Sequence, residues 1–495
     1  MKQKTTSLIE LVKLFDDPKI SEQYINYLCS FESHQYRHDE IGVVNSLLLE
    51  LKLSVRDCEG FFYSYSIKQL NKEFDLLKIS NSFCVNIELK TNSPGLEKIK
   101  KQLINNKHYL KLLKKELHLF TFVESTKVFY SLLENNELVE IEKKEIIKYL
   151  EGTTEELVDL DDVFSPKNVL VSPLNNPERF LNGDYLLTDN QSQIKADILS
   201  CIRNGNQFIG LSGLPGTGKT LVLYDIALEL SKSFKVLLFH CGIMCPGHFY
   251  INEHSDICVY ETKELRLKDI KGFDLVFVDE SHRIFPSQLE KIIKYVPKAS
   301  AKCIFSFDES QRLSFFENNS ETLAIINEKC GENCIFKLKN KIRTNKEIAY
   351  FIVCLRDLTK CNKRVAFENI KIIYEPDNIR SVEIAKQTES FGYKYISYTP
   401  STVFHTLHYQ KNDTNTHRVI GQEFDGVTMI INHNFYYEGD KLKAKEHPNP
   451  DYLYTQLLYQ GLTRAREKLC LIVQEKSVLE KIFELMRKSK EFGGE

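Results

Sequence analysis

The run Gly213–Thr220 (GLPGTGKT) constrains the fold more than any other feature, because it matches the pattern GxxxxGK[ST] at every fixed position. A strand-like run, QFIGLS, precedes it, and an amphipathic helical pattern, LVLYDIALEL, follows it. The glycines permit a loop whose backbone N–H groups turn towards phosphate oxygens, and the helix adds the positive end of its dipole. Lys219 would neutralise the β- and γ-phosphates, and Thr220 would ligate Mg²⁺. The predicted nucleotide-binding residues of this loop are Gly213, Pro215, Gly216, Thr217, Gly218, Lys219 and Thr220.

A second buried strand should bring carboxylates to the same phosphates. FDLVFVDES is an apolar run that ends in Asp279 and Glu280. Asp279 is predicted to hold Mg²⁺, and Glu280 is predicted to activate the attacking water. The alternative is an acidic N-cap for the next helix, a role that Ser281 could fill instead. We therefore expect ATP and Mg²⁺ as cofactors.

Length and charge limit the rest of the chain. The 495 residues suggest about three folding units. The net charge of −2 gives no global basic field, so any site for a polyanion must be a local groove. The thirteen cysteines are odd in number and scattered, which is typical of a reduced, intracellular protein. The start of the chain carries no signal-peptide pattern and no run is apolar enough to span a membrane, so we expect a cytoplasmic protein.

The order of patterns predicts the domains. Residues 151–184 shift towards acid, Pro and Asn, which indicates a linker after a first domain at 1–150. From residue 185, strand-like and helical runs alternate, which predicts parallel sheets with helices on their faces in two further units, 185–340 and 341–495. The strand-like runs are QFIGLS, KVLLFHC, DLVFVDE, AKCIFSF, YKYISYT, GVTMIIN and KLCLIVQ.

From about residue 185 to 473 the chain resembles superfamily 1 helicases and their Schlafen-like ATPase relatives, because motifs similar to theirs occur in order. Besides GLPGTGKT and VDESH, these are LLTDNQSQI, SFDESQRL, LKNKIRTN, THRVIGQEFDGV and LYQGLTRAREKL. The resemblance assigns Gln191 to the adenine base, Gln311 to the γ-phosphate, Gly421 and Glu423 to the ribose, and Arg343 and Arg464 to catalytic arginines. It implies two RecA-like lobes.

The two arginines lie far downstream of the phosphate loop, so ATP would bind between two lobes and close them. Taken alone, either Arg343 or Arg464 could be a surface ion pair. The chain lacks the large accessory insertions that processive helicases of this family carry. This departure favours ATP hydrolysis and short-range translocation on nucleic acid over strong unwinding.

The first domain carries the pattern D-x12-E-L-K, formed by Asp75, Glu88 and Lys90. FDLLKI and FCVNIEL read as two strands of a hairpin, and the period of two places Glu88 and Lys90 on one face. The acids would hold Mg²⁺, and the lysine would orient the attacking water. Over residues 34–130 this resembles the PD-(D/E)XK nuclease core, which implies a restriction-endonuclease-like α/β domain, with Glu40 as an additional acid and Gln102 on the following helix.

The helical pattern over 96–117 is rich in lysine, which suits a phosphate backbone but is also usual for a solvated helix face. The cysteine pairs Cys241/Cys245 and Cys330/Cys334 lack a matching second pair, so we expect no zinc site.

Together these patterns predict an α/β protein in which a Mg²⁺-dependent nuclease is fused to an ATP-driven motor. Its partner would be nucleic acid, DNA rather than RNA, with no membrane. Whether it also forms a homo-oligomer or binds a partner defence protein is left open. By resemblance, such fusions act in antiviral defence. The alternatives are a repair enzyme of the same chemistry, and a nucleotide-gated sensor whose first domain binds nucleic acid without cutting it.

Overall fold

The computed structural model describes residues 4–14, 17–28, 38–67, 72–151, 158–169, 171–265, 270–308, 319–339, 345–400, 414–445 and 452–491. The chain forms two compact units, Met1–Val169 (unit 1) and Leu170–Glu495 (unit 2). The segment 151–184 is therefore divided, because α6 (Leu160–Val163) and α7 (Pro166–Val169) fall in unit 1 and α8 (Pro177–Leu181) falls in unit 2. Among the helices of the described ranges, none is long and apolar enough to cross a membrane.

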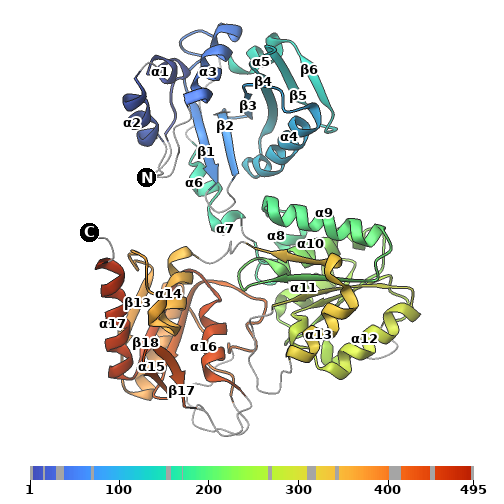
Figure 1. The fold of residues 1–495 in the computed structure, drawn as a ribbon, viewed down its shortest axis with the longest axis vertical. Coiled ribbons are helices and arrows are strands. Elements are labelled where there is room, and N and C mark those ends of the chain that lie inside the picture. The colour runs from blue at the N-terminus through green and yellow to red at the C-terminus, as the bar shows by residue number, and fades with distance from the viewer. Residues whose placement is uncertain are drawn as a thin grey trace. The chain divides into compact units, whose positions relative to one another are not determined.

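Unit 1 is built on a six-stranded sheet with the order β1-β2-β3-β4-β5-β6 (Figure 1). β3 and β4 are parallel because α4 crosses between them, whereas the other neighbouring pairs are antiparallel. The elements are α1 (Leu8–Lys13), α2 (Pro18–Leu28), α3 (His38–Leu51), β1 (Phe61–Ile67), β2 (Lys72–Ile79), β3 (Phe83–Lys90), α4 (Leu96–Leu110), η1 (Lys111–Leu113), β4 (Glu116–Val123), β5 (Val128–Leu132), β6 (Leu138–Ile141) and α5 (Lys143–Leu150).

The two faces of β3 differ in chemistry. Val85, Ile87 and Leu89 join an apolar cluster with residues of α1, α3 and α5. Asn86 and Glu88 alternate with them and face α4 on the other side, where they contact its buried polar residues. The predicted hairpin is thus present, and it carries its polar side chains beneath one helix.

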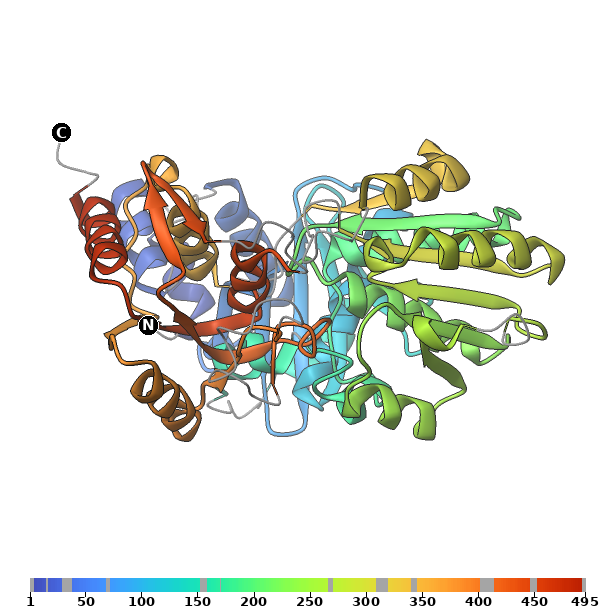
Figure 2. The same cartoon turned by 90° about the horizontal axis from the view of Figure 1, so that it is seen from below.

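The first lobe of unit 2 is a parallel sheet with the order β12-β7-β11-β10-β8-β9. Helices cover both faces (Figure 2): α9, α10 and α11 share one apolar cluster, and α12 and α13 share the other. The elements are α9 (Asp189–Arg203), β7 (Phe208–Gly213), α10 (Lys219–Ser231), β8 (Val236–His240), α11 (Pro246–His254), β9 (Ile257–Glu261), η2 (Thr262–Glu264), β10 (Leu275–Asp279), η3 (Ser281–Arg283), α12 (Pro286–Lys298), β11 (Lys302–Phe307), α13 (Asn319–Cys330), η4 (Glu332–Cys334) and β12 (Ile335–Leu338).

The second lobe is a four-stranded parallel sheet, β13-β18-β15-β14, with a separate β16–β17 hairpin. Its elements are α14 (Lys346–Arg356), η5 (Leu358–Lys360), β13 (Ile370–Tyr374), α15 (Asn378–Gln387), η6 (Thr388–Phe391), β14 (Lys394–Tyr395), β15 (Phe424–Ile431), β16 (Phe435–Glu438), β17 (Lys441–Ala444), α16 (Tyr454–Leu462), β18 (Ala465–Val473) and α17 (Lys476–Glu491).

Residues 171–184, which composition suggests as linker, pack against both lobes of unit 2. Val171, Leu174 and Phe180 belong to the core cluster of the first lobe. The carbonyl of Leu174 lies so close to Gly247 of α11 that an added Cβ there would be 2.1 Å from its oxygen. Asn175 Oδ1 accepts a hydrogen bond of 2.9 Å from the backbone N–H of Glu423, in the second lobe. This segment is therefore part of the folded unit.

The predicted α/β class with parallel sheets is confirmed. Each of the seven strand-like runs of unit 2 contains a strand, although YKYISYT contributes only the two residues of β14. The predicted helix over 96–117 is shorter than expected. It ends at Leu110 because Lys114 takes a left-handed conformation after η1, and β4 begins at Glu116. The nuclease-like nature of unit 1 stays a prediction.

Candidate active sites

The phosphate loop joins the carboxyl end of β7 to α10, and its shape depends on glycine. Gly216 (φ 75°) and Gly218 (φ 86°) are left-handed, and Gly218 is the N-cap of α10. A Cβ at Gly213 would lie 2.7 Å from Thr217 Oγ1, so this position also requires glycine. The hydroxyl of Thr217 donates to the carbonyl of Leu214 at 2.8 Å and closes the loop on itself. This backbone fits the phosphate chain of a nucleotide.

Lys219 is buried at the base of this loop. Its Nζ donates to the carbonyl oxygens of Gly213 at 2.8 Å and Leu214 at 3.1 Å, and lies 3.5 Å from Asp308 Oδ2. Pro215 is buried in the same loop. The ammonium therefore lies where the strand, the loop and the helix meet, and its contact with phosphates stays a prediction.

Asp279 ends β10 beside the loop, although β11 lies between β10 and β7 in the sheet. Its Oδ2 lies 3.4 Å from the hydroxyl of Thr220, and its Oδ1 accepts a 2.6 Å hydrogen bond from Ser306 of β11. Asp279 and Ser306 are fully buried. A hydroxyl and a carboxylate oxygen together form a donor set that suits Mg²⁺.

Glu280 follows in a left-handed conformation (φ 57°), held by a hydrogen bond from its N–H to Ser306 Oγ at 3.2 Å. Its Oε2 lies 3.4 Å from both His282 Nε2 and Arg283 Nε. Burial lowers the pKa of His282 to about 3, so Arg283 is the charged neighbour at neutral pH. Burial alone would raise the pKa of Glu280, but its cationic surroundings hold this pKa well below the usual range, and the carboxylate is ionised.

Residues of the second lobe reach the same site. Arg464 is buried, donates through Nε to the Gln460 carbonyl at 3.2 Å and through Nη1 to the Gln422 carbonyl at 3.2 Å, and interacts electrostatically with Glu280 and Glu423. Burial lowers the pKa of Arg464, but an arginine at neutral pH keeps its charge. The backbone fixes this guanidinium near the carboxylate of Glu280.

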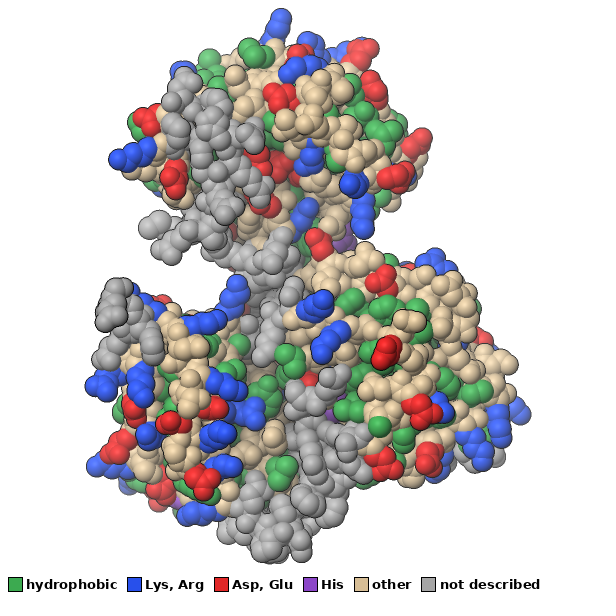
Figure 3. All heavy atoms as spheres, viewed as in Figure 1, with side chains coloured by type: hydrophobic (Ala, Val, Ile, Leu, Met, Phe, Trp, Pro, Cys, Tyr) green, Lys and Arg blue, Asp and Glu red, His purple; other side chains and the backbone are tan. Residues whose placement is uncertain are grey.

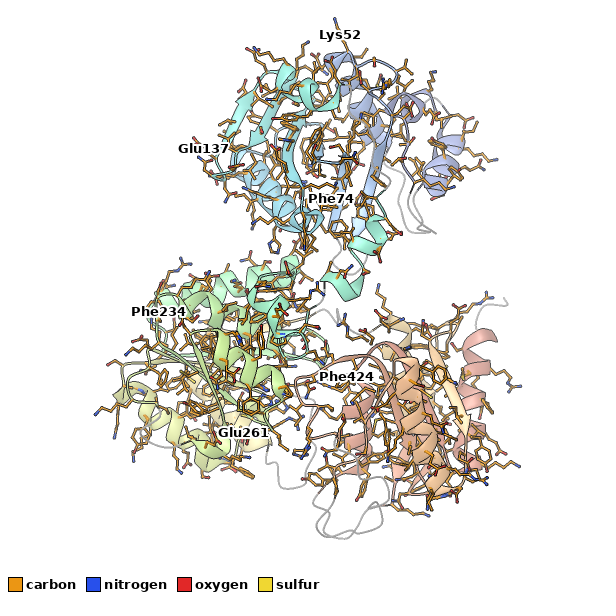
Figure 4. The ribbon with its side chains drawn as sticks, turned by 180° about the vertical axis from the view of Figure 1, so that it is seen from behind. Lys52, Phe74, Glu137, Phe234, Glu261 and Phe424 are labelled. Atoms are coloured by element: carbon orange, nitrogen blue, oxygen red, sulfur yellow. The ribbon has the colours of Figure 1, made fainter. Side chains whose placement is uncertain are left out.

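Gly421 marks a close approach of the two lobes. It has φ 77°, and an added Cβ would lie 2.9 Å from Leu174 Cδ1 and 3.6 Å from His240 Cε1, at the end of β8. Phe424, the residue directly after the predicted ribose contact Glu423, begins β15 and is labelled in Figure 4. The segment that carries Gly421 and Glu423 thus lies against the first lobe.

Gln191 lies against the phosphate loop. It forms a capping box with Thr188 at the start of α9, and its Nε2 donates to the carbonyl of Thr217 at 3.0 Å. Its contact with an adenine base stays a prediction. Gln311 and Arg343 lie outside the described residues.

Three residues of this site were not predicted. Asp308 and Ser306 lie at the end of β11, and Asn175 belongs to the segment taken for linker. Asp308 carries the same signal as Asp279, an acid directly after an apolar strand, and could have been found. Asn175 carries no such signal, because its partner Glu423 is 248 residues away.

In unit 1 the structure brings Asp75, Glu88 and Lys90 together on β2 and β3; Phe74, labelled in Figure 4, precedes Asp75. Lys90 Nζ lies 3.6 Å from Asp75 Oδ2 and 3.7 Å from Glu88 Oε2. Asp75 Oδ2 also accepts a 2.7 Å hydrogen bond from the N–H of Leu89. Two carboxylates that share one cation fit the binding of a metal ion between them.

Glu88 is fully buried, and burial, followed by the charge of Asp75, raises its pKa to about 7. Gln102 of α4 donates to Glu88 Oε2, so the predicted helix residue does face the site. Glu40 Oε2 lies 3.5 Å from the hydroxyl of Tyr63. Among the described residues, no group of three or more His, Cys, Asp or Glu side chains is arranged to hold a metal ion.

The lysines of the 96–117 segment divide into two groups. Lys107 Nζ donates to the Glu134 carbonyl at 2.7 Å and Asn136 Oδ1 at 2.9 Å, and Lys115 Nζ donates to the Asn81 carbonyl at 2.9 Å. These two tie the helix region to neighbouring loops. Exposed lysines are found at positions 98, 101, 111 and 114, and Lys100 is half-buried.

No family model and no curated protein matches this chain. Among solved structures, it is similar to the Pif1 helicase from Candida albicans, with 11% identity and a TM-score of 0.32, over 61% of this chain and 99% of that one. It is also similar to the Pif1 helicase from Bacteroides in complex with ADP-AlF3 and ssDNA, with 13% identity and a TM-score of 0.31, over 62% of this chain and 98% of that one.

Proposed function

We propose that unit 2 hydrolyses ATP with Mg²⁺ and uses the cycle to move along nucleic acid, preferably DNA. The observation that carries this proposal is the convergence of Lys219, Asp279 and Glu280 from the first lobe with Arg464 from the second. A site assembled from two lobes can couple the state of the nucleotide to their separation.

Each residue has a role that its position supports. The loop N–H groups and Lys219 hold the phosphates, and Thr220 and Asp279 would hold Mg²⁺, which neutralises charge on the phosphate oxygens when bound. Glu280 orients the attacking water and accepts its proton. Arg464 stabilises the negative charge that develops on the transferred phosphoryl group, an effect worth about 10³–10⁵ in kcat for catalytic arginines.

ATP turnover by the full chain tests this proposal. The measurement compares the wild type with Lys219→Ala and Arg464→Ala, with and without single-stranded DNA, duplex DNA or RNA. We expect both variants to lose turnover, and the nucleic acid that stimulates the wild type most identifies the track. Wild-type turnover that no nucleic acid stimulates would contradict a motor and favour a nucleotide-gated switch.

We further propose that unit 1 is a Mg²⁺-dependent nuclease. The convergence of Asp75, Glu88 and Lys90 supports it: the carboxylates would hold the metal ion, and Lys90 orients the attacking water. The exposed lysines near α4 suit a phosphate backbone. In this view the motor positions the nuclease on foreign DNA in antiviral defence, and a repair role is the alternative with the same chemistry.

Cleavage of end-labelled DNA and RNA tests the nuclease. We expect Mg²⁺-dependent products from the wild type and from the control Glu137→Ala, an exposed acid of unit 1, and none from Asp75→Asn. Equal cleavage by Asp75→Asn would show a contaminant or another site. Protection of cells against phage by the wild type, lost with Asp75→Asn, would favour defence over repair.

A further inference from the structure

A buried network of amide side chains lies beneath Glu88. Asn106 of α4 donates through Nδ2 to Glu88 Oε1 at 2.7 Å and to Asn86 Oδ1 at 2.7 Å. Asn86 donates in turn to Glu88 Oε1 and to the carbonyl of Leu76, both at 3.2 Å. Asn86, Glu88 and Asn106 are each fully buried.

Asn106 interrupts an apolar stripe. The other buried residues of α4 are Ile99, Leu103, Tyr109 and Leu110. A leucine would continue this stripe, whereas a buried amide must find hydrogen-bond partners. The partners of Asn106 are acceptors, so its amide nitrogen faces them, and its Oδ1 is then left buried without a hydrogen-bond partner. The amide of Asn106 therefore serves Asn86 and Glu88 rather than the apolar packing of α4.

The network acts on one oxygen of Glu88. Asn86 and Asn106 both donate to Oε1, whereas Oε2 accepts from Gln102 of α4 and faces Lys90, which is also close to Asp75. The two hydrogen bonds on Oε1 limit rotation of the carboxylate and so help to fix the direction of Oε2. Oε2 is therefore aimed at the space that Asp75 and Lys90 share.

We propose that Asn106 is a positioning residue which, through Glu88 Oε1 and Asn86, orients Glu88 Oε2 for a divalent cation. This inference rests on the proposed nuclease function of unit 1. It assigns to Asn106 no contact with substrate. Loss of a side chain that orients a metal ligand weakens metal affinity by roughly 10–100-fold.

Binding of Mn²⁺ to the full chain, measured by calorimetry, tests the proposal with Asn106→Leu. We expect affinity to fall by about 10–100-fold and the Mg²⁺ concentration for half-maximal cleavage to rise in parallel. The unfolding temperature should fall, because Asn86 Oδ1 and Glu88 Oε1 lose a buried donor, so affinity is measured well below the unfolding transition of each variant. The matched control is Asn105→Leu, the neighbouring asparagine on the same helix, and it should bind Mn²⁺ like the wild type.

The outcomes are distinct. Wild-type protein that neither binds Mn²⁺ nor cleaves would overturn the proposed nuclease, and this inference with it. Wild-type binding that Asn106→Leu retains in full would overturn the positioning role alone. If Asn106→Leu fails to fold, Asn106→Ala is judged by the same affinity measurement.

Discussion

Single residues fix the closest approaches in unit 2. Gly247 is the second residue of α11. It leaves space for the carbonyl of Leu174, and the Cβ of any other residue would fill that space. At this position the neighbour is backbone, which cannot rotate away as a side chain can. The segment 171–176 is therefore positioned by the absence of one methyl group.

We predict that Gly247→Ala destabilises the protein by about 1–3 kcal/mol, the usual range for overpacking a well-packed site. Thermal unfolding of the variant and the wild type measures this. Phe249→Ala on the same helix is the control, because Phe249 is exposed. An unchanged unfolding temperature for Gly247→Ala would show that the segment moves aside at little cost.

His417 makes the stability of unit 2 depend on pH. Burial, with a smaller effect of Arg283, lowers its pKa to about 4. The unfolded chain protonates a histidine near pH ~6.5, so the neutral folded form is fully favoured above that pH, and stability is lost as the pH falls towards about 4. We predict that, as the pH falls through this range, the unfolding temperature of the wild type decreases more than that of His417→Gln, which carries no titratable group at this position. Parallel curves for the two proteins would exclude this role.

At the scale of elements, the strands were predictable and their partners were not. Parallel strands buried on both faces read as continuous apolar runs, which is why β7, β8, β10 and β11 stand out in the sequence. The contact between Ser306 and Asp279 depends on which strands become neighbours, and long crossovers decide that. The same limit applies to Asn106 and Glu88, which are joined only when α4 packs on the sheet.

The same contrast between local patterns and contacts across elements applies to the residues of the candidate sites. The phosphate loop, Asp279 and the triad of unit 1 were found because their spacing is local to one loop, one strand or one hairpin. The supporting residues Ser306, Asn86 and Asn175 were missed because each acts through a residue on another element.

The link between β10 and β11 leads to a third prediction. Ser306 donates to Asp279 Oδ1 and accepts from the N–H of Glu280, so it orients both acids. We predict that Ser306→Ala lowers ATP turnover by about tenfold or more, because a hydrogen bond to a charged group contributes roughly 1.5–3 kcal/mol. The Mg²⁺ concentration for half-maximal turnover should rise. Ser231→Ala, which removes a hydroxyl at the end of α10, is the control; equal turnover in both variants would argue against this role.

At the scale of the whole molecule, the relevant property is how charged side chains are distributed over the surface. Acidic and basic side chains are interspersed over the visible surface (Figure 3), in keeping with the net charge of −2. Under the proposed function, a polyanion would therefore be held by local groups of cations, and the loss of each group should be measurable separately.

We predict that replacing Lys98, Lys101 and Lys111 with alanine weakens the binding of single-stranded DNA. The slope of log K against log salt should shrink by about two, because each phosphate contact on a single strand contributes roughly 0.7. Replacement of Lys143, Lys144 and Lys148, which are exposed on or near α5, removes the same charge and is the control. If both triple variants change the slope equally, net charge rather than the α4 surface governs binding.

The packing of residues 171–184 bears on how this protein can be dissected. A shortened chain that starts at residue 185, where composition suggests that the next domain begins, would discard Val171, Leu174 and Phe180 from the core of the first lobe. It would also discard Asn175 and its bond to the second lobe. A fragment of unit 2 that folds and keeps its lobes in register should therefore start no later than Val171, and the stretch ahead of Tyr185 cannot be exchanged for a neutral spacer when domains are recombined.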